Sequence, residues 1–398
     1  MRGTVIYYHR LQFPSESGQT IQVLRDYHAL ASLGHTVHWI YRSTHPLTEE
    51  EEATALRAYG LEPVPTLHLH PLAEGGRGKR RLRETVIQIL RTANEGVVFL
   101  LTRTLDHARA ALALRDWGGR PGLKVILELH ETAIPHMIYR EQGRWLRALL
   151  SRFQEKRGFR MLDGIVCTVG SQRVLLDNLY PEHAPVAILP NGVPTRLLGL
   201  PPPRRENAGA AVRLGYAGQL NAWKNVDVMI EALKYLPQRV VLDIAGGKAG
   251  EEARTRTALM EIAERSGVAG RVSYVGFLPP VKVPEFIAGM DILLLPLGDN
   301  AQSRHFTSPM KLFEYAASGV PMVVTRQPTT ESLVEDGVQA LMTEPGSARS
   351  MAIAVEALIA EPALGRKLAD NAREWAGQYT YDKRAARLTE FLDLVAKT

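Results

Sequence analysis

The segment FTSPMKLFEYAASGVPMVVT (306–325) places a serine, a proline, a lysine and a glutamate at the start of an otherwise apolar helix. Ser308 can cap this helix, and Pro309 suits its first position, where a backbone N–H is not needed. The free N–H groups of the first turn, around Lys311, would then present partial positive charge to a phosphate. Glu314 follows one turn later, where its two carboxylate oxygens can accept both hydroxyls of a ribose diol. The residues alone equally allow an ordinary surface helix.

The elements that would position this helix follow an alternating pattern. Apolar strand-like runs are separated by helix-like segments such as Gln19–Leu33, which Gly34 closes. This pattern predicts parallel sheets covered by helices on both faces, with ligands bound at the carboxyl ends of the strands. The predicted strands are 4–9, 36–42, 97–102, 124–130, 164–169 and 186–190, followed after a break by 213–218, 240–246, 271–277, 291–296 and 321–325.

The break is the segment GLPPPRRENAGAA (199–211), whose prolines, charges and small residues are typical of a linker. A chain of 398 residues is also long for a single core. We therefore predict an α/β protein with two doubly wound, Rossmann-like domains, residues 1–198 and 212–381, that face each other across a cleft. The natural ligand site would be that cleft.

The composition, with 45% hydrophobic and 23% charged residues, is typical of an ordinary soluble protein. The single cysteine, Cys167, excludes an intrachain disulfide and lies in a predicted buried strand, which suits the cytoplasm. We find no apolar run of signal-peptide length and none of 18 residues. The net charge of +6 weakly favours a phosphate-bearing or anionic partner.

Five segments resemble motifs of the retaining family 4 of the GT-B fold glycosyltransferases, and they follow one another along the chain in the order typical of that family. The resemblance covers nearly the whole chain. The helix at 306–325 resembles the family's donor-site motif. The other four are LPNGVP (189–194), YAGQLNAWKNVDVMIEAL (216–233), VSYVGFLPPVKVPEFIAGMDILLLP (272–296) and ESLVEDGVQALMTEPGSARSMAIAVEAL (331–358).

The resemblance implies an N-terminal acceptor-binding domain, a C-terminal nucleotide-sugar-binding domain, and a last helix, 382–398, that crosses back onto the first. It implies a hexosyltransferase that moves a sugar from a nucleotide-diphosphate donor to a hydroxyl, with retention of configuration. UDP is slightly favoured over GDP as the donor nucleotide. The acceptor would be a glycan or a lipid-linked molecule, in cell-surface polysaccharide or glycolipid synthesis. No metal ion or other cofactor is expected.

Carried over by position, the family pattern assigns catalytic roles to His130, Lys224 and Glu314. His130 would align the transferred sugar, and the ammonium of Lys224 would stabilise charge on the leaving diphosphate. Gly18 would let the backbone approach the phosphates. Each residue also has an ordinary interpretation: a strand-end histidine, a solvated lysine, a turn glycine. The expected donor-binding set is Gly18, Gln219, Lys224, Phe277, Ser308, Pro309, Met310, Lys311, Leu312 and Glu314.

Two departures from the family pattern keep other functions open. Phe306 stands where many members have a sugar-binding glutamate, and Gln219 where many have an arginine. These changes motivate two alternatives: a catalytically silent partner that keeps the fold, and a nucleotide-sugar epimerase of the same fold. A dinucleotide dehydrogenase is disfavoured, because the first strand is followed by HRLQFPSESGQT without the GxGxxG pattern.

Two basic segments, 77–91 and 140–160, also contain apolar residues at helical spacing. Such helices can lie on an anionic membrane, or can pack their apolar side on the sheet. We expect packing on the sheet for 140–160, and leave both interpretations open for 77–91. A nucleic acid partner is not expected, since no aromatic platform or known motif accompanies the charge.

Overall fold

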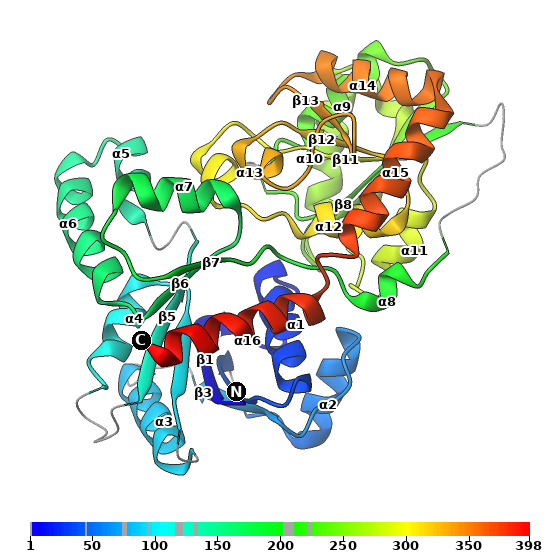
Figure 1. Cartoon of the computed structure of the whole chain (residues 1–398). Helices are drawn as coiled ribbons and strands as arrows, with labels where there is room; N and C mark the ends of the chain where they lie inside the picture. The colour runs from blue at the N-terminus through cyan, green and yellow to red at the C-terminus, as the bar shows by residue number, and fades with distance from the viewer. Residues whose placement is uncertain are drawn as a thin grey trace. The chain divides into compact units, whose positions relative to one another are not determined.

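The chain forms two compact α/β units in the computed structural model (Figure 1), which describes residues 2–43, 46–73, 78–93, 96–115, 122–130, 134–201, 211–221 and 224–398. The first unit comprises Met1–Pro190 with His305–Thr307 and Tyr381–Thr398, and the second comprises Asn191–Arg304 with Ser308–Thr380. The first unit thus ends at Pro190, earlier than the predicted boundary at 198. Most of the predicted linker 199–211 lies outside the described residues.

The first unit is built on a parallel sheet, whose described strands run in the order β3-β2-β1-β4-β5-β6-β7. Successive residues of the central strand alternate between two cores. Ile6 and Tyr8 lie in one, and Val5 and Tyr7 in the other, because side chains of a strand point to opposite faces. The strands are β1 (Thr4–Gln12), β2 (Thr36–Ser43), β3 (Leu67–Ala73), β4 (Val98–Thr102), β5 (Leu123–Glu128), β6 (Gly164–Cys167) and β7 (Val186–Ile188).

Helices cover both faces of this sheet, as the alternating pattern predicts. The C-terminal helix α16 packs against α1, and Cys167 is buried as a free thiol within β6. The helices are α1 (Gly18–Ser32), α2 (Glu49–Ala58), α3 (Gly78–Thr92), α4 (Leu105–Leu112), α5 (Pro135–Glu141), α6 (Trp145–Met161), α7 (Gly170–Leu179) and α16 (Tyr381–Lys397).

The second unit repeats the architecture, and its described strands run in the parallel order β10-β9-β8-β11-β12-β13. This is the Rossmann order. Successive strands are added toward one edge of the sheet from β8 to β10 and toward the other edge from β11 to β13, so the order reverses between the neighbours β8 and β11. The strands are β8 (Val212–Gly218), β9 (Val240–Gly246), β10 (Val272–Gly276), β11 (Ile292–Leu295), β12 (Met322–Thr325) and β13 (Leu341–Thr343). The prediction of two doubly wound parallel sheets is confirmed.

The helices that cover the second sheet are α8 (Thr195–Leu198), α9 (Asp227–Ala232), α10 (Glu252–Arg265), α11 (Val283–Ala288), α12 (Met310–Ser318), α13 (Pro328–Glu331), α14 (Ala348–Ala360) and α15 (Pro362–Ala376). At the carboxyl ends of β8 and β9 the backbones nearly touch. A Cβ on Gly246 would lie 1.7 Å from the carbonyl oxygen of Gly218, and Gly246 has a φ of 134°. Only glycine fits there, which accounts for the glycine in IAGGK.

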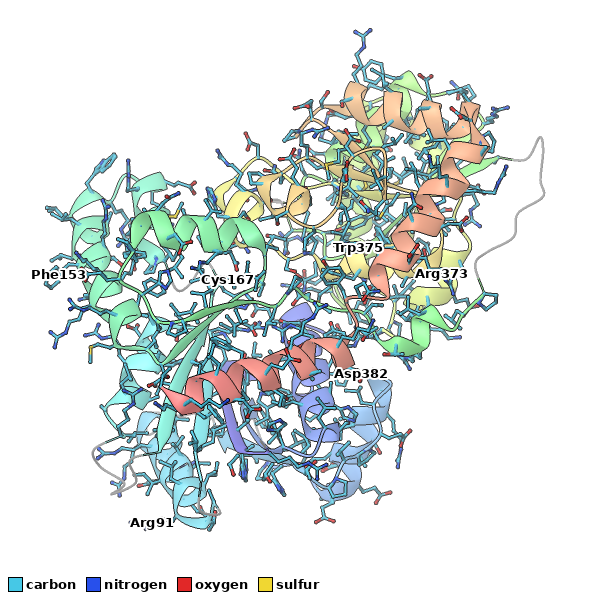
Figure 2. All side chains as sticks on the ribbon, viewed as in Figure 1. Arg91, Phe153, Cys167, Arg373, Trp375 and Asp382 are labelled. Atoms are coloured by element: carbon cyan, nitrogen blue, oxygen red, sulfur yellow. The ribbon has the colours of Figure 1, made fainter. Side chains whose placement is uncertain are left out.

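The two basic helices of the first unit differ in what they bury. Helix α3 buries Val86, Ile89 and Leu90 against the sheet, so its apolar side packs as a core helix. Helix α6 does the reverse, and the expectation that its apolar side packs on the sheet is wrong. Its side chains Leu146 and Phe153 are 81% and 73% exposed. Figure 2 shows Phe153 on the outer side of this helix.

A different set of residues forms the inner side of α6. Ala148, Glu155, Gly158 and Phe159 are the buried positions. A Cβ on Gly158 would come within 2.7 Å of Leu105, so the close approach of α6 to α4 requires this glycine. These four residues face inward, and the large apolar residues Trp145, Leu146, Leu149, Leu150 and Phe153 are left outside. Across the described part of the chain, no helix is both long and apolar enough to cross a membrane.

Candidate active site

Helix α12 begins one residue later than predicted, and Ser308 does not cap it. The N-cap is Pro309, with an extended backbone (φ −71°, ψ 112°) and no side-chain capping bond. The hydroxyl oxygen of Ser308 instead accepts a hydrogen bond from the backbone N–H of Asn191 at 3.1 Å. The side-chain amide of Asn191 donates to the Ser308 carbonyl at 2.6 Å. Asn191, from the segment LPNGVP, therefore fixes the start of α12.

Lys224, Lys311 and Glu314 come together in the second unit. The Lys311 ammonium lies 2.8 Å from a carboxylate oxygen of Glu314, and the two side chains are 26% and 10% exposed. Burial, and next the nearby charge of Lys311, lower the pKa of Lys224 to about 8. The positive charge of Lys311 thus disfavours a second positive charge on Lys224, and a bound anion would relieve this repulsion. The N-terminal end of α12 adds partial positive charge at the same place.

Other residues of the predicted donor set lie at the carboxyl ends of the same sheet. Gln219 follows β8 with an exposed side chain, and the hydroxyl of Tyr216 donates to its carbonyl at 2.7 Å. Phe277 follows β10 and is partly buried. Leu312 differs, because its side chain is fully buried and its N–H donates to the Pro309 carbonyl at 3.0 Å. Leu312 thus supports the helix from within the core.

Gly18 is the first residue of α1 in the first unit. A Cβ at this position would meet nothing within 4 Å, and no positive φ is recorded for it. The fold of the unit therefore does not require glycine there. The missing side chain leaves open space at the helix start, which suits a close approach by a ligand.

His130 lies two residues after the end of β5, and its side chain contacts a buried ionic cluster. Its Nε2 is 2.8 Å from a carboxylate oxygen of Glu128. The other contacts of Glu128 are Arg103 at 2.8 Å and Arg384, from the C-terminal helix, at 3.0 Å. Burial alone would raise the pKa of Glu128, but these two arginines and the bond from His130 outweigh it and hold the pKa well below its usual range. Glu128 is thus ionised and fixes the orientation of His130.

A second carboxylate completes this cluster. Asp26 on α1 lies 3.1 Å from Arg384, and burial raises its pKa. Glu128, Arg103, Arg384 and Asn191 were not among the site residues that the sequence predicted. For Glu128 and the two arginines the only signal was residue type: a charged residue within an apolar strand or on an apolar helix face is seldom buried unless it is paired. In the described ranges, no group of three or more His, Cys, Asp or Glu residues is placed to hold a metal ion.

The two Rossmann-like sheets, and the lysines and glutamate gathered in the second unit, can be set beside comparisons to known families. Residues 17–192 match the model of the glycosyl transferase 4-like domain, and residues 211–361 match that of the glycosyl transferases group 1. The lipopolysaccharide core biosynthesis glycosyltransferase LpsE of Rhizobium meliloti is 31% identical over 44% of this chain and 46% of its own length. A D-inositol 3-phosphate glycosyltransferase of Xylanimonas cellulosilytica is 26% identical over 57% and 56%. The chain thus spans about half the length of these relatives.

Solved structures give the same fold at low identity. HepE of Anabaena, in complex with UDP and glucose, superposes with a TM-score of 0.71 at 16% identity, covering 99% of this chain and 100% of its own. The sucrose-phosphate synthase of Thermosynechococcus elongatus gives 0.76 at 17% identity, with full coverage of both chains. Together, the two family models cover most of the chain, one in each unit. The chain therefore belongs to the GT-B fold glycosyltransferases of family 4, with a glycosyl transferase 4-like domain followed by a group 1 domain.

Proposed function

We propose that this protein transfers a sugar from a nucleotide-diphosphate donor, UDP-linked rather than GDP-linked, to an acceptor hydroxyl with retention of configuration. The observation that carries the proposal is the convergence of Lys224 and Lys311 beside Glu314 at the start of α12. The two ammonium groups would bind the diphosphate, and Glu314 would accept the ribose hydroxyls. The UDP complex of HepE supports a UDP donor. LpsE supports a product in cell-surface polysaccharide or glycolipid synthesis.

In the transfer step, the acceptor oxygen bonds to C1 of the donor sugar, and the bond from C1 to the β-phosphate oxygen breaks. The diphosphate leaves with the electron pair and takes up the hydroxyl proton. Lys224 and the N-terminus of α12 favour this step because they stabilise charge that develops on the diphosphate. His130, held by Glu128, would align the transferred sugar. We further propose that no metal ion is needed, because the two lysines supply the positive charge.

Donor binding is tested by thermal unfolding with UDP, GDP, ADP and CMP, in buffer that contains EDTA. A site filled to about 100 times its dissociation constant adds about 2.7 kcal/mol of stability. We expect UDP to stabilise the wild type without metal, and Glu314→Ala to lose the effect. Glu356→Ala removes an exposed glutamate from the same unit and serves as the control. Stabilisation by none of the nucleotides would contradict the proposal and favour a silent partner protein.

The affinity for UDP should fall as the pH rises through the pKa of Lys224, which is about 8. A diphosphate binds the protonated ammonium, and above this pKa the free protein loses that proton. Between pH 7 and pH 9 the dissociation constant should therefore rise about tenfold. Calorimetric titration at both values measures it. In Lys224→Arg the guanidinium stays protonated, so its affinity should be nearly independent of pH. If Lys224→Arg loses as much affinity for UDP between pH 7 and pH 9 as the wild type does, the pH dependence comes from UDP itself and not from Lys224.

We also propose that the enzyme is cytoplasmic and docks on the anionic inner face of the cell membrane through α6. The exposed apolar residues of this helix are Trp145, Leu146, Leu149, Leu150 and Phe153. Counted from Phe153, the exposed cations Lys156, Arg157 and Arg160 follow at positions i+3, i+4 and i+7, which lie on the same side of a helix. Apolar side chains with cations beside them match the interface of an anionic bilayer.

Vesicle flotation tests this docking surface. The wild type should bind vesicles that contain phosphatidylglycerol better than vesicles of pure phosphatidylcholine. The double substitution Leu149→Glu with Phe153→Glu should weaken binding at least about tenfold. Burial of each apolar side chain in the membrane contributes about 1.5–3 kcal/mol, and both contributions are lost. Val174→Glu, at another exposed apolar position of the same unit (60% exposed), is the matched control. Equal binding by the double variant would exclude α6 as the docking surface.

A further inference from the structure

Five polar side chains in the interior of the first unit form a closed ring of ion pairs and hydrogen bonds. Glu128 lies 2.8 Å from Arg103 and 3.0 Å from Arg384. Arg384 in turn lies 3.1 Å from Asp26. Gln22 closes the ring, because its amide nitrogen donates to Asp26 and its amide oxygen accepts from Arg103. None of the five residues is more than 5% exposed, and we call this set the buried ring.

Gln22 is the type of residue that its place in the buried ring requires. A side-chain amide both donates and accepts hydrogen bonds, so it can join the Asp26 carboxylate to the Arg103 guanidinium. A carboxylate or an ammonium at this place could bind only one of the two. Gln22 and Asp26 are four residues apart on α1, which places them on the same face of the helix. The buried ring therefore holds α1 through two successive turns.

The buried ring joins the two segments of the first unit that the proposed function uses. Glu128 is the last residue of β5, and His130 follows two residues later. Gln22 lies one turn after Gly18, the first residue of α1. Arg103, which follows β4, bridges the two segments with one amino group: its Nη2 lies 2.8 Å from Glu128 and also donates to Gln22. The place of His130 relative to the start of α1 therefore depends on Arg103.

The same bonds fix the proton of the His130 side chain. Glu128 is ionised and can only accept, so the Nε2 of His130 carries the proton in their bond of 2.8 Å. The oxygen that accepts this proton, Oε1, is also the oxygen to which Arg103 donates. His130 and Arg103 thus share one carboxylate oxygen. Any shift of the guanidinium moves the atom that orients the imidazole.

We propose that Arg103 and Gln22 are positioning residues of the sugar transfer, and that they hold His130 in one orientation through Glu128. Their effect is on the rate, because a misplacement of about 1 Å in a group that aligns the sugar can lower a rate by about 10². UDP lacks the sugar that His130 would align, so the affinity for UDP does not depend on the buried ring. The inference rests on the proposed transferase function and names two further residues on which that function depends.

A double-mutant cycle with His130 tests this inference, with UDP release from UDP-glucose as the assay and a phospholipid extract as the source of acceptor. Arg103→Met should lower kcat by about tenfold or more and leave the dissociation constant of UDP unchanged. In the His130→Ala background, the same substitution should lower kcat by less than about twofold, because the residue that Arg103 positions is already gone. Arg103→Lys keeps the charge and should recover part of the activity.

Two more variants separate positioning from a general loss of stability. Gln22→Met opens the buried ring but keeps both ion pairs of Glu128, so the protein should fold while kcat still falls. His35→Leu removes buried bonds to the Gly3 N–H and to the Thr389 hydroxyl, at the amino ends of the strands and outside the buried ring. This control should lower the resistance to urea but leave kcat unchanged.

Several results would overturn the inference. Arg103→Met and Gln22→Met could both have the kcat of the wild type, or His35→Leu could lower kcat as much as Gln22→Met does. A double variant whose loss of kcat is the product of the two single losses would also refute it, because Arg103 would then act independently of His130. A wild type that neither binds UDP nor releases it from UDP-glucose would contradict the proposed function, and this inference with it.

Discussion

Replacement of Lys224 by alanine should lower kcat by about 10²–10³. In the proposed reaction, the ammonium of Lys224 stabilises charge that appears on the diphosphate only as the sugar leaves. Because its interaction is stronger in the transition state than with the bound donor, its loss should reduce kcat more than it weakens binding of UDP. The measurement is UDP release from UDP-glucose, with a phospholipid extract as the source of acceptor.

Two further variants make this result specific. Lys234→Ala removes an exposed lysine of the same unit and should leave the rate unchanged. Lys224→Arg keeps the positive charge and should recover part of the activity. A Lys224→Ala enzyme with wild-type kcat and only weaker UDP binding would reduce Lys224 to a ground-state binding residue. In that case the N-terminus of α12, and not Lys224, would be the group that stabilises the charge on the leaving diphosphate.

Replacement of Arg384 by alanine should destabilise the protein by about 3–5 kcal/mol. The Arg384 side chain is 4% exposed, and it pairs with Glu128 at 3.0 Å and with Asp26 at 3.1 Å. It also donates to the Pro190 carbonyl at 3.0 Å. Without the guanidinium, two buried carboxylates lose their shared partner, and burying an unpaired charge is costly. Urea unfolding followed by circular dichroism measures the change.

Arg387→Ala, at an exposed position on the same helix, should change stability by no more than about 0.5 kcal/mol. Arg384→Lys keeps one charge but cannot reach both carboxylates with a planar fork, so it should fall between the two. If Arg384→Ala costs as little as Arg387→Ala, the buried cluster does not hold α16 on the first unit, and apolar packing on α1 does.

The strands that were predicted correctly share one property: they are predominantly β-branched, aromatic or other apolar residues between glycine, proline or polar turns. Strand β3 was missed because LHLHPLA alternates histidine with leucine and contains Pro71, which argued against a strand. In the sheet its histidines are accommodated, since His38 and His70 share a hydrogen bond of 2.9 Å. Strand β13 is only the three residues Leu341–Thr343, too short for a periodic signal.

The candidate donor site divides in a similar way. The types and spacing of Lys311 and Glu314 were informative, because residues three apart on a helix are neighbours and can form the pair that the structure shows. The cap at Ser308 was not predictable in the same way. Local physics favours a serine cap, but Asn191, which is 117 residues away in sequence, already holds the hydroxyl.

The sequence by itself determined two parallel α/β sheets, the family and the residues available for a phosphate site, because local periodicity and short motifs encode each of these. Only the tertiary structure decided which side of α6 faces inward. Its inner side is formed by Ala148, Glu155, Gly158 and Phe159, and Gly158 permits close contact with Leu105 of α4. The structure alone also revealed the cluster around Glu128, whose partner Arg384 is 256 residues distant. Burial makes such charges pair, and no local pattern specifies which distant residue is the partner.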